Sequence, residues 1–274
     1  MHPATTSEFH VLRIPSRAVD ADLLAVEEPV EIRVNGAPLA VTMRTPGHDA
    51  ELAAGFCLTE GIIDEPDELE RAEACTLADY GNVVLITLSG KASERWRNQQ
   101  TESRREFYLS SSCGLCGTQT LERIARRIEL ITQHFCIAPD VLLRMPHIMM
   151  ESQDTFARTG GLHASALFRA NGELQLIRED VGRHNAVDKV IGALLLSGQL
   201  PNSGGVLMLS GRISFELVQK AARAGIAIIA AIGAPSSLAV QAAEQFGITL
   251  IGFLRAERFN VYSHAHRIEK ASPK

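Results

Sequence analysis

The alternation of apolar runs with helix-forming segments between residues 206 and 253 constrains the fold of this chain more than any other feature. The apolar runs favour strands over 206–209, 226–232 and 248–253. The segments between them favour helices over 214–224 and 235–246. The runs are continuously apolar rather than alternating, which is typical of parallel strands that are covered on both faces. We therefore expect an α/β arrangement in which right-handed crossovers join the parallel strands.

Polar residues follow each of the three expected strands, in the segments 210–212, 233–237 and 253–258. The crossovers bring the carboxyl ends of parallel strands to one edge of the sheet, where open α/β sheets bind ligands. Gly211 allows a ligand to approach the backbone closely, and arginines at 212, 255 and 258 can each bind a phosphate through two hydrogen bonds. These residues together predict a site for a pyrophosphate-bearing ligand. Glycine by itself is a weaker signal, because it also occurs at strand-turn-helix junctions where only the backbone conformation requires it.

Shorter patterns account for most of the remaining chain. Asn35-Gly36 and Asn171-Gly172 each separate two strand-like runs, as in type I′ hairpins. Periodicity predicts further elements, namely helices over 49–59, 118–130 and 183–196 and a strand over 82–88. Residues 1–28 are expected to form a weakly structured lead-in or arm, and 91–106 a polar connecting stretch. The overall class is therefore α/β in the second half and α+β for the chain as a whole.

The pair Cys113 and Cys116, in the run Ser112-Cys-Gly-Leu-Cys-Gly117, is the best candidate for reactive chemistry. Five cysteines in 274 residues do not make a disulfide framework, and a close pair in a reducing compartment is more often catalytic or metal-binding. The pair precedes the expected helix over 118–130, and a helix N-terminus lowers the pKa of a nearby thiol. A nucleophilic or sulfur-carrying thiol fits this position.

A zinc site is the main alternative for this pair. Tetrahedral zinc needs two further ligands, usually a second close pair. The other cysteines, at 57, 75 and 136, are widely separated, and the first two fit apolar core positions. His264 and His266 could complete a site but are only two residues apart near the C-terminus. We therefore favour a site without metal.

The segment 179–189 gathers charged groups at the start of the expected helix 183–196: Asp180, Arg183, His184 and Lys189. It predicts either a capped helix with a solvated polar face or a cluster that binds an anion. His163 begins an expected strand, where a histidine is more often structural than catalytic. The zinc deaminases carry glutamate two residues after such a histidine, but Ser165 stands there in this chain.

Charge and hydropathy exclude some classes of function. The formal charge of −5 argues against general nucleic-acid binding. The longest apolar run, residues 226–232, is far shorter than the ~20 residues that cross a bilayer. The N-terminus lacks the basic and apolar regions of a secretory signal. We expect a cytoplasmic protein that binds neither nucleic acid nor membrane.

Several of these segments, taken together, resemble the formate dehydrogenase accessory sulfurtransferase family, often called FdhD. The resemblance runs from about Glu28 to Ile268 and rests on these motifs: Cys113-Gly-Leu-Cys116-Gly, Gly160-Gly-Leu-His163-Ala, Glu179-Asp-Val-Gly-Arg-His-Asn-Ala-Val-Asp-Lys189, Ser210-Gly-Arg212, Glu216-x-Val-Gln-Lys220, Ala234-Pro-Ser-Ser-Leu-Ala239 and Asn260-Val-Tyr-Ser-His264. The combination of an upstream Cys-x-x-Cys with the segment 179–189 is highly specific.

The resemblance implies a function and a fold. Members of the family take sulfur from a cysteine desulfurase as a persulfide. They pass it to the molybdenum of bis(molybdopterin guanine dinucleotide) before this cofactor enters formate dehydrogenase. For the sulfur carrier the cofactor is a cargo, and a guanine nucleotide can mimic it. The resemblance also implies two domains and a homodimer. Residues 1–120 would form a smaller N-terminal α+β domain, and residues 121–274 a three-layer domain similar to cytidine deaminases. A cofactor-binding chaperone without sulfur transfer and a small zinc protein are the alternatives.

By position in the motifs, Cys113 matches the persulfide carrier of the family and Cys116 its partner. The cofactor-binding stretch matches Phe253, Leu254, Arg255, Ala256, Glu257 and Arg258, and Gly211 and Arg212 lie on the same expected edge. Many members carry glycine in place of Glu257. An acidic side chain beside a pyrophosphate is unfavourable unless it points away or pairs with a neighbouring arginine. Serines also precede Cys113 where members often have Thr-Gly.

Overall fold

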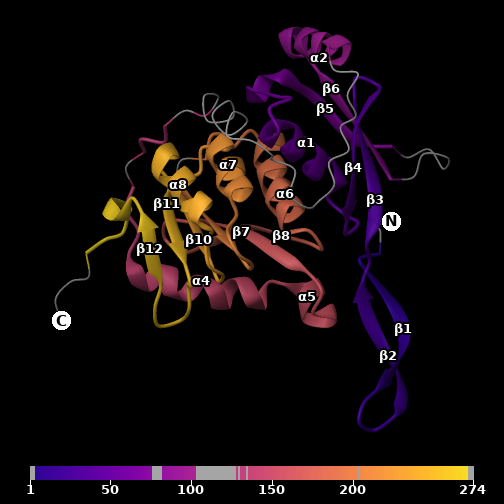
Figure 1. The fold of residues 1–274 in the computed structure, drawn as a ribbon, viewed down its shortest axis with the longest axis vertical. Helices are drawn as coiled ribbons and strands as arrows, with labels where there is room; N and C mark the ends of the chain where they lie inside the picture. The colour runs from indigo at the N-terminus through magenta and orange to yellow at the C-terminus, as the bar shows by residue number, and fades with distance from the viewer. Residues whose placement is uncertain are drawn as a thin grey trace.

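The computed structural model describes residues 4–75, 82–102, 128, 130–133, 135–202 and 204–270. Within these ranges the chain forms a two-stranded ribbon, a four-stranded sheet and a six-stranded sheet (Figure 1). Helices pack on the two larger sheets, so the mixed α/β class is confirmed. No helix in the described part is long and apolar enough to cross a membrane.

The six-stranded sheet has the order β12-β11-β10-β9-β7-β8. Its bounds are β7 (His163–Arg169), β8 (Leu174–Asp180), β9 (Gly205–Leu209), β10 (Ile228–Ala231), β11 (Thr249–Gly252) and β12 (Asn260–Ser263). β9, β10 and β11 are parallel, as their continuous apolar runs predict. β7 runs antiparallel to β9, and β8 pairs with β7 through the predicted hairpin at Asn171-Gly172. The start of β7 therefore lies at the same edge as the end of β9.

Helices cover both faces of this sheet (Figure 1). The helices α6 (Arg183–Leu196), α7 (Phe215–Arg223) and α8 (Ser237–Phe246) lie on one face, and α4 (Pro139–Glu151) lies on the other. Each face has its own cluster of buried apolar side chains. α4 and the short α5 (Asp154–Thr159) had no counterpart among the predicted elements. Pro146 inside α4 interrupts the usual sequence signal of a helix.

The four-stranded sheet has the order β4-β3-β6-β5, with bounds β3 (Glu28–Val34), β4 (Ala37–Arg44), β5 (Leu69–Ala74) and β6 (Val83–Leu88). β3 and β4 form the predicted hairpin, and both Asn35 and Gly36 have the positive φ of a type I′ turn, 49° and 82°. The helix α1 (Asp49–Thr59) has the predicted bounds. The apolar cluster under α1 is continuous with that under α6, so one core joins the two sheets.

The crossing of α1 and α6 depends on two glycines. A Cβ atom on Gly55 would lie 1.9 Å from the carbonyl oxygen of Asp188, and one on Gly192 would lie 1.8 Å from that of Glu51. The backbones of the two helices are therefore in contact. No other residue fits at either position without moving a helix.

The first half differs from the sequence prediction in two stretches, residues 6–25 and 90–102. Residues expected to be a loose arm form the regular antiparallel ribbon of β1 (Thr6–Arg13) and β2 (Ala18–Ala25), which projects from the body (Figure 1). The polar stretch 91–106 instead contains the helix α2 (Gly90–Glu102), anchored by buried Trp96, whose Nε1 donates to the Val34 carbonyl at 3.2 Å. Of the predicted helix 118–130 only residues 128 and 130 are described, neither of them helical, and the predicted domain boundary at residue 120 lies outside the described residues.

Candidate functional site

The turns that follow β9, β10 and β11 meet at one edge of the six-stranded sheet, which we call the carboxyl edge (residues 210–213, 232–236 and 253–258). Direct backbone hydrogen bonds join them. The Gly233 N–H donates to the Gly211 carbonyl at 3.0 Å, and the Phe253 N–H donates to the Gly233 carbonyl at 3.1 Å. The predicted convergence of these segments is therefore confirmed.

Glycine is needed where these turns stack. A Cβ atom on Gly233 would lie 2.6 Å from the Gly211 carbonyl oxygen and 2.8 Å from Cα of Arg212. A Cβ atom on Gly211 would have room, because its nearest neighbour would be Nδ1 of His163 at 3.4 Å. The edge thus presents backbone at Gly211 with a histidine ring directly beside it.

The three arginines of the carboxyl edge differ in what they contact. Arg255 is partly committed to the fold, because its Nη1 donates to the carbonyls of Ile232 at 2.7 Å and Leu254 at 3.0 Å. The side chains of Arg212 and Arg258 are exposed and form no hydrogen bond or ion pair with any described residue. Both can therefore bind an anionic ligand without losing a contact to a described residue.

Glu257 is also exposed, and in the described part of the chain it pairs with neither Arg255 nor Arg258. Its carboxylate is solvated rather than held beside an arginine. The unfavourable effect that the sequence suggests for an acidic residue here is thus weakened by solvent screening.

The segment 253–258 divides into an anchor and an exposed loop. The side chain of Leu254 is fully buried in the core under α4, so it holds the loop rather than a ligand. Phe253 has a positive φ of 53° and is 43% exposed, an unusual combination for an aromatic residue. Such an exposed ring can stack on a planar base.

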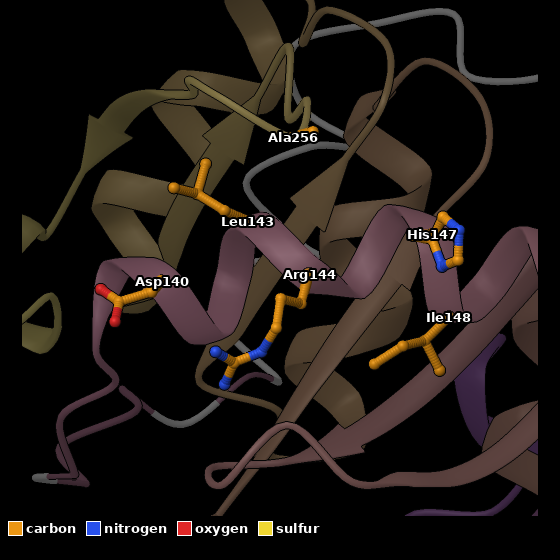
Figure 2. A pocket seen from close by; sticks show the side chains of 6 residues that line it. All are labelled: Asp140, Leu143, Arg144, His147, Ile148 and Ala256. Carbon is orange, nitrogen blue, oxygen red and sulfur yellow. The ribbon is translucent and has the colours of Figure 1, made fainter.

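Ala256, further along the loop, faces a shallow hollow of about 450 Å³ beside α4. Figure 2 shows Ala256 on the loop and the other labelled side chains on the helix. Those lining side chains are Asp140, Leu143, Arg144, His147 and Ile148.

Half of the charged segment 179–189 is buried and fully partnered. The Nζ of Lys189 lies 2.7 Å from Oδ2 of Asp180, and both side chains are buried. Lys189 also donates to the Thr45 carbonyl at 2.9 Å, and the Thr45 N–H donates to Asp180 at 3.2 Å. Asp180 and Lys189 therefore join the six-stranded sheet to the segment after β4, and neither faces solvent.

A second buried network is centred on Asp188, the residue before Lys189 in α6. Lys220 of α7 donates to both carboxylate oxygens of Asp188 at 3.0 and 2.9 Å and to Glu60 at 3.0 Å. Thr59 of α1 donates to Asp188 at 2.8 Å. Burial raises the pKa of Asp188 to about 6 against the attraction of Lys220. Although burial opposes its charge, the two carboxylates raise the pKa of Lys220.

The other half of the segment, Arg183 and His184, lies beside the carboxyl edge. Burial lowers the pKa of His184 to about 4, and the positive charges of Arg183 and Lys220 act in the same direction. Burial also lowers the pKa of His163, reinforced by Arg183 and opposed by Asp180. Both imidazoles are therefore neutral at pH 7.

His184 does not form a hydrolytic triad. Its Nε2 faces both the Ser214 hydroxyl at 3.4 Å and a Glu216 carboxylate oxygen at 4.0 Å. A triad needs the acid on the opposite ring nitrogen from the nucleophile. Serine hydrolysis is therefore not the chemistry of this group.

The remaining candidates fall into two groups. Cys113 and Cys116 lie outside the described residues. Cys57 is buried, which raises the pKa of its thiol and makes it inert. Nε2 of His264 lies 3.0 Å from the backbone carbonyl oxygen of Glu244. This contact does not favour the zinc alternative.

The sequence did not reveal the partners of the segment 179–189. Met43, Thr45 and Thr59 contact it from 129 to 144 positions away in the chain. The break at Thr45-Pro46-Gly47 was the one local signal near these contacts. It indicates a turn and says nothing of what the turn touches.

A glycine-lined carboxyl edge, with exposed arginines that the described residues leave unpaired, is an arrangement with which α/β proteins can bind anionic ligands. The family model described as FdhD/NarQ matches residues 25–269, and the chain belongs to this family. The resemblance seen in the motifs is therefore confirmed.

Relatives from distant organisms match most of the chain. It is 48% identical over 269 residues to the sulfur carrier protein FdhD of Streptomyces avermitilis, covering 96% of this chain and 95% of that protein. It is 45% identical over 253 residues to the protein of the same name from Sulfolobus acidocaldarius, covering 92% and 94%.

A solved structure also matches. It is the crystal structure of a protein from Desulfotalea psychrophila assigned as a formate dehydrogenase accessory protein, with a TM-score of 0.75 and 26% sequence identity. The match covers 96% of this chain and 98% of that one. The arrangement of sheets and helices is thus shared across nearly the full length.

Proposed function

We propose that this chain is a sulfurtransferase that carries sulfur to a molybdenum cofactor for formate dehydrogenase. The observation that carries the proposal is the match over nearly the whole chain to relatives named sulfur carrier protein FdhD. The accessory role named for the Desulfotalea psychrophila protein supports formate dehydrogenase as the recipient. The Cys-x-x-Cys at 113–116 provides the thiol that a sulfur carrier needs.

The first step is transfer of sulfur to Cys113. The Cys113 thiolate attacks the terminal sulfur of a persulfide on a cysteine desulfurase. The new S–S bond forms on Cys113 as the old one breaks, and the desulfurase thiolate leaves. An ordinary thiol pKa of ~8.5 leaves only a few per cent thiolate at pH 7, so activation of Cys113 matters.

In the second step Cys116 releases the sulfur. The Cys116 thiolate attacks Sγ of Cys113, hydrosulfide leaves toward the molybdenum, and a Cys113–Cys116 disulfide forms. The two cysteine thiols supply the two electrons that reduce the sulfane sulfur. A dithiol reductant then restores both thiols for the next cycle.

The cargo, bis(molybdopterin guanine dinucleotide), binds at the carboxyl edge. Arg212 and Arg258 are free to bind its phosphates, and the exposed ring of Phe253 can stack on guanine. The backbone at Gly211 allows close approach. A guanine nucleotide alone is expected to occupy part of this site.

We further propose a homodimer in the cytoplasm and a three-layer second domain similar to cytidine deaminases. Helices on both faces of the six-stranded sheet support the layer arrangement. The division into residues 1–120 and 121–274 stays a prediction.

Mass spectrometry of the 113–116 peptide after treatment with a cysteine desulfurase and cysteine tests the sulfur step. Wild type is expected to gain one sulfur atom, and Cys113→Ala none. Labelling of Cys113→Ala but not of Cys116→Ala would reverse the roles of the two cysteines.

A Cys113→Ala/Cys116→Ala variant separates the proposal from a cofactor chaperone. It is expected to bind guanine nucleotide but not to activate formate dehydrogenase. Activation by this variant would establish the chaperone. One zinc per chain, lost with either cysteine, would establish a zinc protein instead.

A further inference from the structure

The ribbon of β1 and β2 carries exposed apolar side chains at its far end, which we call the tip (Leu12, Ile14 and Val19). Leu12 and Val19 pair across the two strands and therefore share one face, and Ile14 lies in the turn that follows β1. The three residues are 55%, 71% and 69% exposed. A group of neighbouring exposed apolar side chains indicates an interaction surface more strongly than scattered ones do.

The base of the ribbon is fastened beside α5. Nη2 of Arg158 donates to Oγ1 of Thr6 at 3.1 Å, and a Cβ atom on Gly161 would lie 3.7 Å from Cβ of Ala25. From this attachment the two strands extend away from the body, with their turn at the outer end (Figure 1). A two-stranded ribbon is at best marginally stable by itself in water. The ribbon is thus held at its base, while its tip is presented to another molecule.

The hollow beside α4 has the apolar walls that such a tip requires. Leu143, Ile148 and Ala256 line it, and its volume is about 450 Å³. Figure 2 shows Asp140 and Arg144 on the same stretch of α4 as the two apolar residues of the helix. Aliphatic side chains can therefore enter a hollow that has charged groups beside it.

The turn of the ribbon and the α4 hollow carry opposite charges. Arg17 lies in the turn, and its exposed side chain forms no hydrogen bond or ion pair with a described residue. The exposed carboxylate of Asp140, at the start of α4, likewise has no partner among the described residues. An ion pair between these two groups would fix the orientation of the two surfaces more than it adds to their affinity.

The strands of the ribbon are acidic where α4 is basic. Nε of Arg13 lies 3.4 Å from Oδ2 of Asp20, and its Nη2 lies 3.5 Å from Oδ1 of Asp22, so one cation serves two carboxylates. On α4 the exposed guanidinium of Arg144 pairs with no described residue. From its turn along β2 the ribbon presents a cation and then acids, whereas α4 presents an acid and then a cation. The charges of the two surfaces therefore match in order.

We propose that the tip of the ribbon docks into the α4 hollow of a second copy of this chain. Two-fold symmetry makes this contact twice, since each copy supplies one ribbon and one hollow. The segment 6–25 approaches the roughly 20–30 residues that each side contributes to a stable protein interface. This inference rests on the homodimer of the proposed function and names the surfaces that form it.

Analytical ultracentrifugation of the full-length chain measures the effect of the tip. Wild type is expected to sediment as a dimer at micromolar concentration. Leu12→Thr/Val19→Thr keeps residues that are compatible with strands but removes apolar surface. It should raise the dissociation constant of the dimer by about tenfold or more. Leu143→Gln, which alters the hollow, should raise this constant as well.

Val41→Thr/Met43→Thr is the matched control. Val41 is 58% exposed and, like Val19, is a valine in a strand, but β4 belongs neither to the ribbon nor to the hollow. The control variant is expected to stay dimeric. Melting temperatures of all variants within about 2 °C of wild type show that the fold is kept. Equal loss of the dimer in the control would place the interface on the four-stranded sheet and overturn the inference.

Photocrosslinking identifies what the tip contacts. Full-length chain with benzoylphenylalanine in place of Ile14 is prepared with and without isotope label, and the two samples are mixed until their subunits exchange. Irradiation is expected to join residue 14 of one chain to the segment 139–151 of the other. Crosslinks within one chain, or between chains at another surface, would overturn the inference.

The remaining outcomes separate this inference from the proposed function. A Leu12→Thr/Val19→Thr variant as dimeric as wild type would refute the docking and leave the homodimer standing. If that variant stays dimeric but no longer activates formate dehydrogenase, the ribbon binds the recipient instead. A monomeric wild type would refute both the docking and the homodimer. Sulfur transfer is judged separately, by labelling of Cys113.

Discussion

The two halves of the segment 179–189 use the same kinds of side chain for different purposes. Asp180 and Lys189 are buried and lie 2.7 Å apart, and their other hydrogen bonds are with backbone groups and, for Asp180, with the side-chain amide of Asn185. The side chain of Arg183, between them in sequence, forms no hydrogen bond or ion pair with any described residue. A single charged motif thus provides both a buried ion pair between the two sheets and a guanidinium that no described residue pairs.

The difference shows that polarity alone does not mark a binding residue. Breaking a buried, paired charge should cost stability, whereas removing an unpaired one should cost binding. The predictions below separate these two effects, beginning with the α1–α6 contact and ending with Arg183.

Gly192→Ala is expected to destabilise the chain most, by more than about 4 kcal/mol. The added methyl group would lie 1.8 Å from the Glu51 carbonyl oxygen, so α1 and α6 must separate. Urea unfolding measures the loss. Gly204→Ala is the control, because no atom lies within 4 Å of the added group there. Equal stability of the two variants would contradict the backbone contact.

Lys189→Met should destabilise by about 3–5 kcal/mol, because it leaves the Asp180 carboxylate buried without its cation. A second change, Asp180→Asn, made in the Lys189→Met variant should recover part of this loss. Thermal unfolding of the single and double variants checks this order of stabilities. If the double variant is less stable than Lys189→Met, the ion pair is not the source of the effect.

The ion pair between Glu51 of α1 and Arg178 of β8 should make the junction of the sheets sensitive to acid. Burial opposes the charge of Glu51, but Arg178 and His48 outweigh it and lower the pKa from 4.5 to about 2. A carboxylate with a depressed folded-state pKa stabilises the fold above its unfolded pKa, and this contribution disappears as the pH falls from 4.5 to 2.

Glu51→Gln should therefore reduce stability at pH 7 by on the order of 1 kcal/mol, after allowing for solvent screening. It should flatten the loss between pH 4.5 and 2. Unfolding of both proteins across this range checks the effect. Parallel curves would show that Glu51 does not titrate with folding.

Arg183→Gln should change stability least, by no more than about 0.5 kcal/mol. Because its positive charge lowers the pKa of His163 and His184, its removal should raise both pKa values. A pH titration of the imidazole signals by NMR measures the shift. An unchanged His163 together with a large loss of stability would place Arg183 with the buried half instead.

Sequence patterns predicted the regular elements best where one period dominates. The bounds of α1 and α6 and the parallel order of β9, β10 and β11 followed from helical periodicity and continuous apolar runs. α4 was missed because Pro146 disrupts the pattern, and α2 because its sequence is polar except for Ala92 and Trp96.

The candidate site was predictable in part. Gly211 and Arg212 could be placed at the carboxyl edge because strand ends of parallel β-α-β units always meet. His163 could not be placed there, because an antiparallel strand reaches the same edge only through its pairing with β9. Nor could the sequence separate Arg255, whose guanidinium donates to the Ile232 carbonyl, from Arg258, whose side chain has no partner among the described residues.

The sequence by itself determined the family, the parallel core and the Cys-x-x-Cys on which sulfur transfer is proposed. These features depend on local order, since periodicity and motif spacing are properties of neighbouring residues. The tertiary structure decided which charged residues of the segment 179–189 are buried and which face the edge. Their partners, such as Thr45 and Lys220, lie far away in the chain. Burial and pairing, which set the cost of a charge, exist only once these distant segments have packed together.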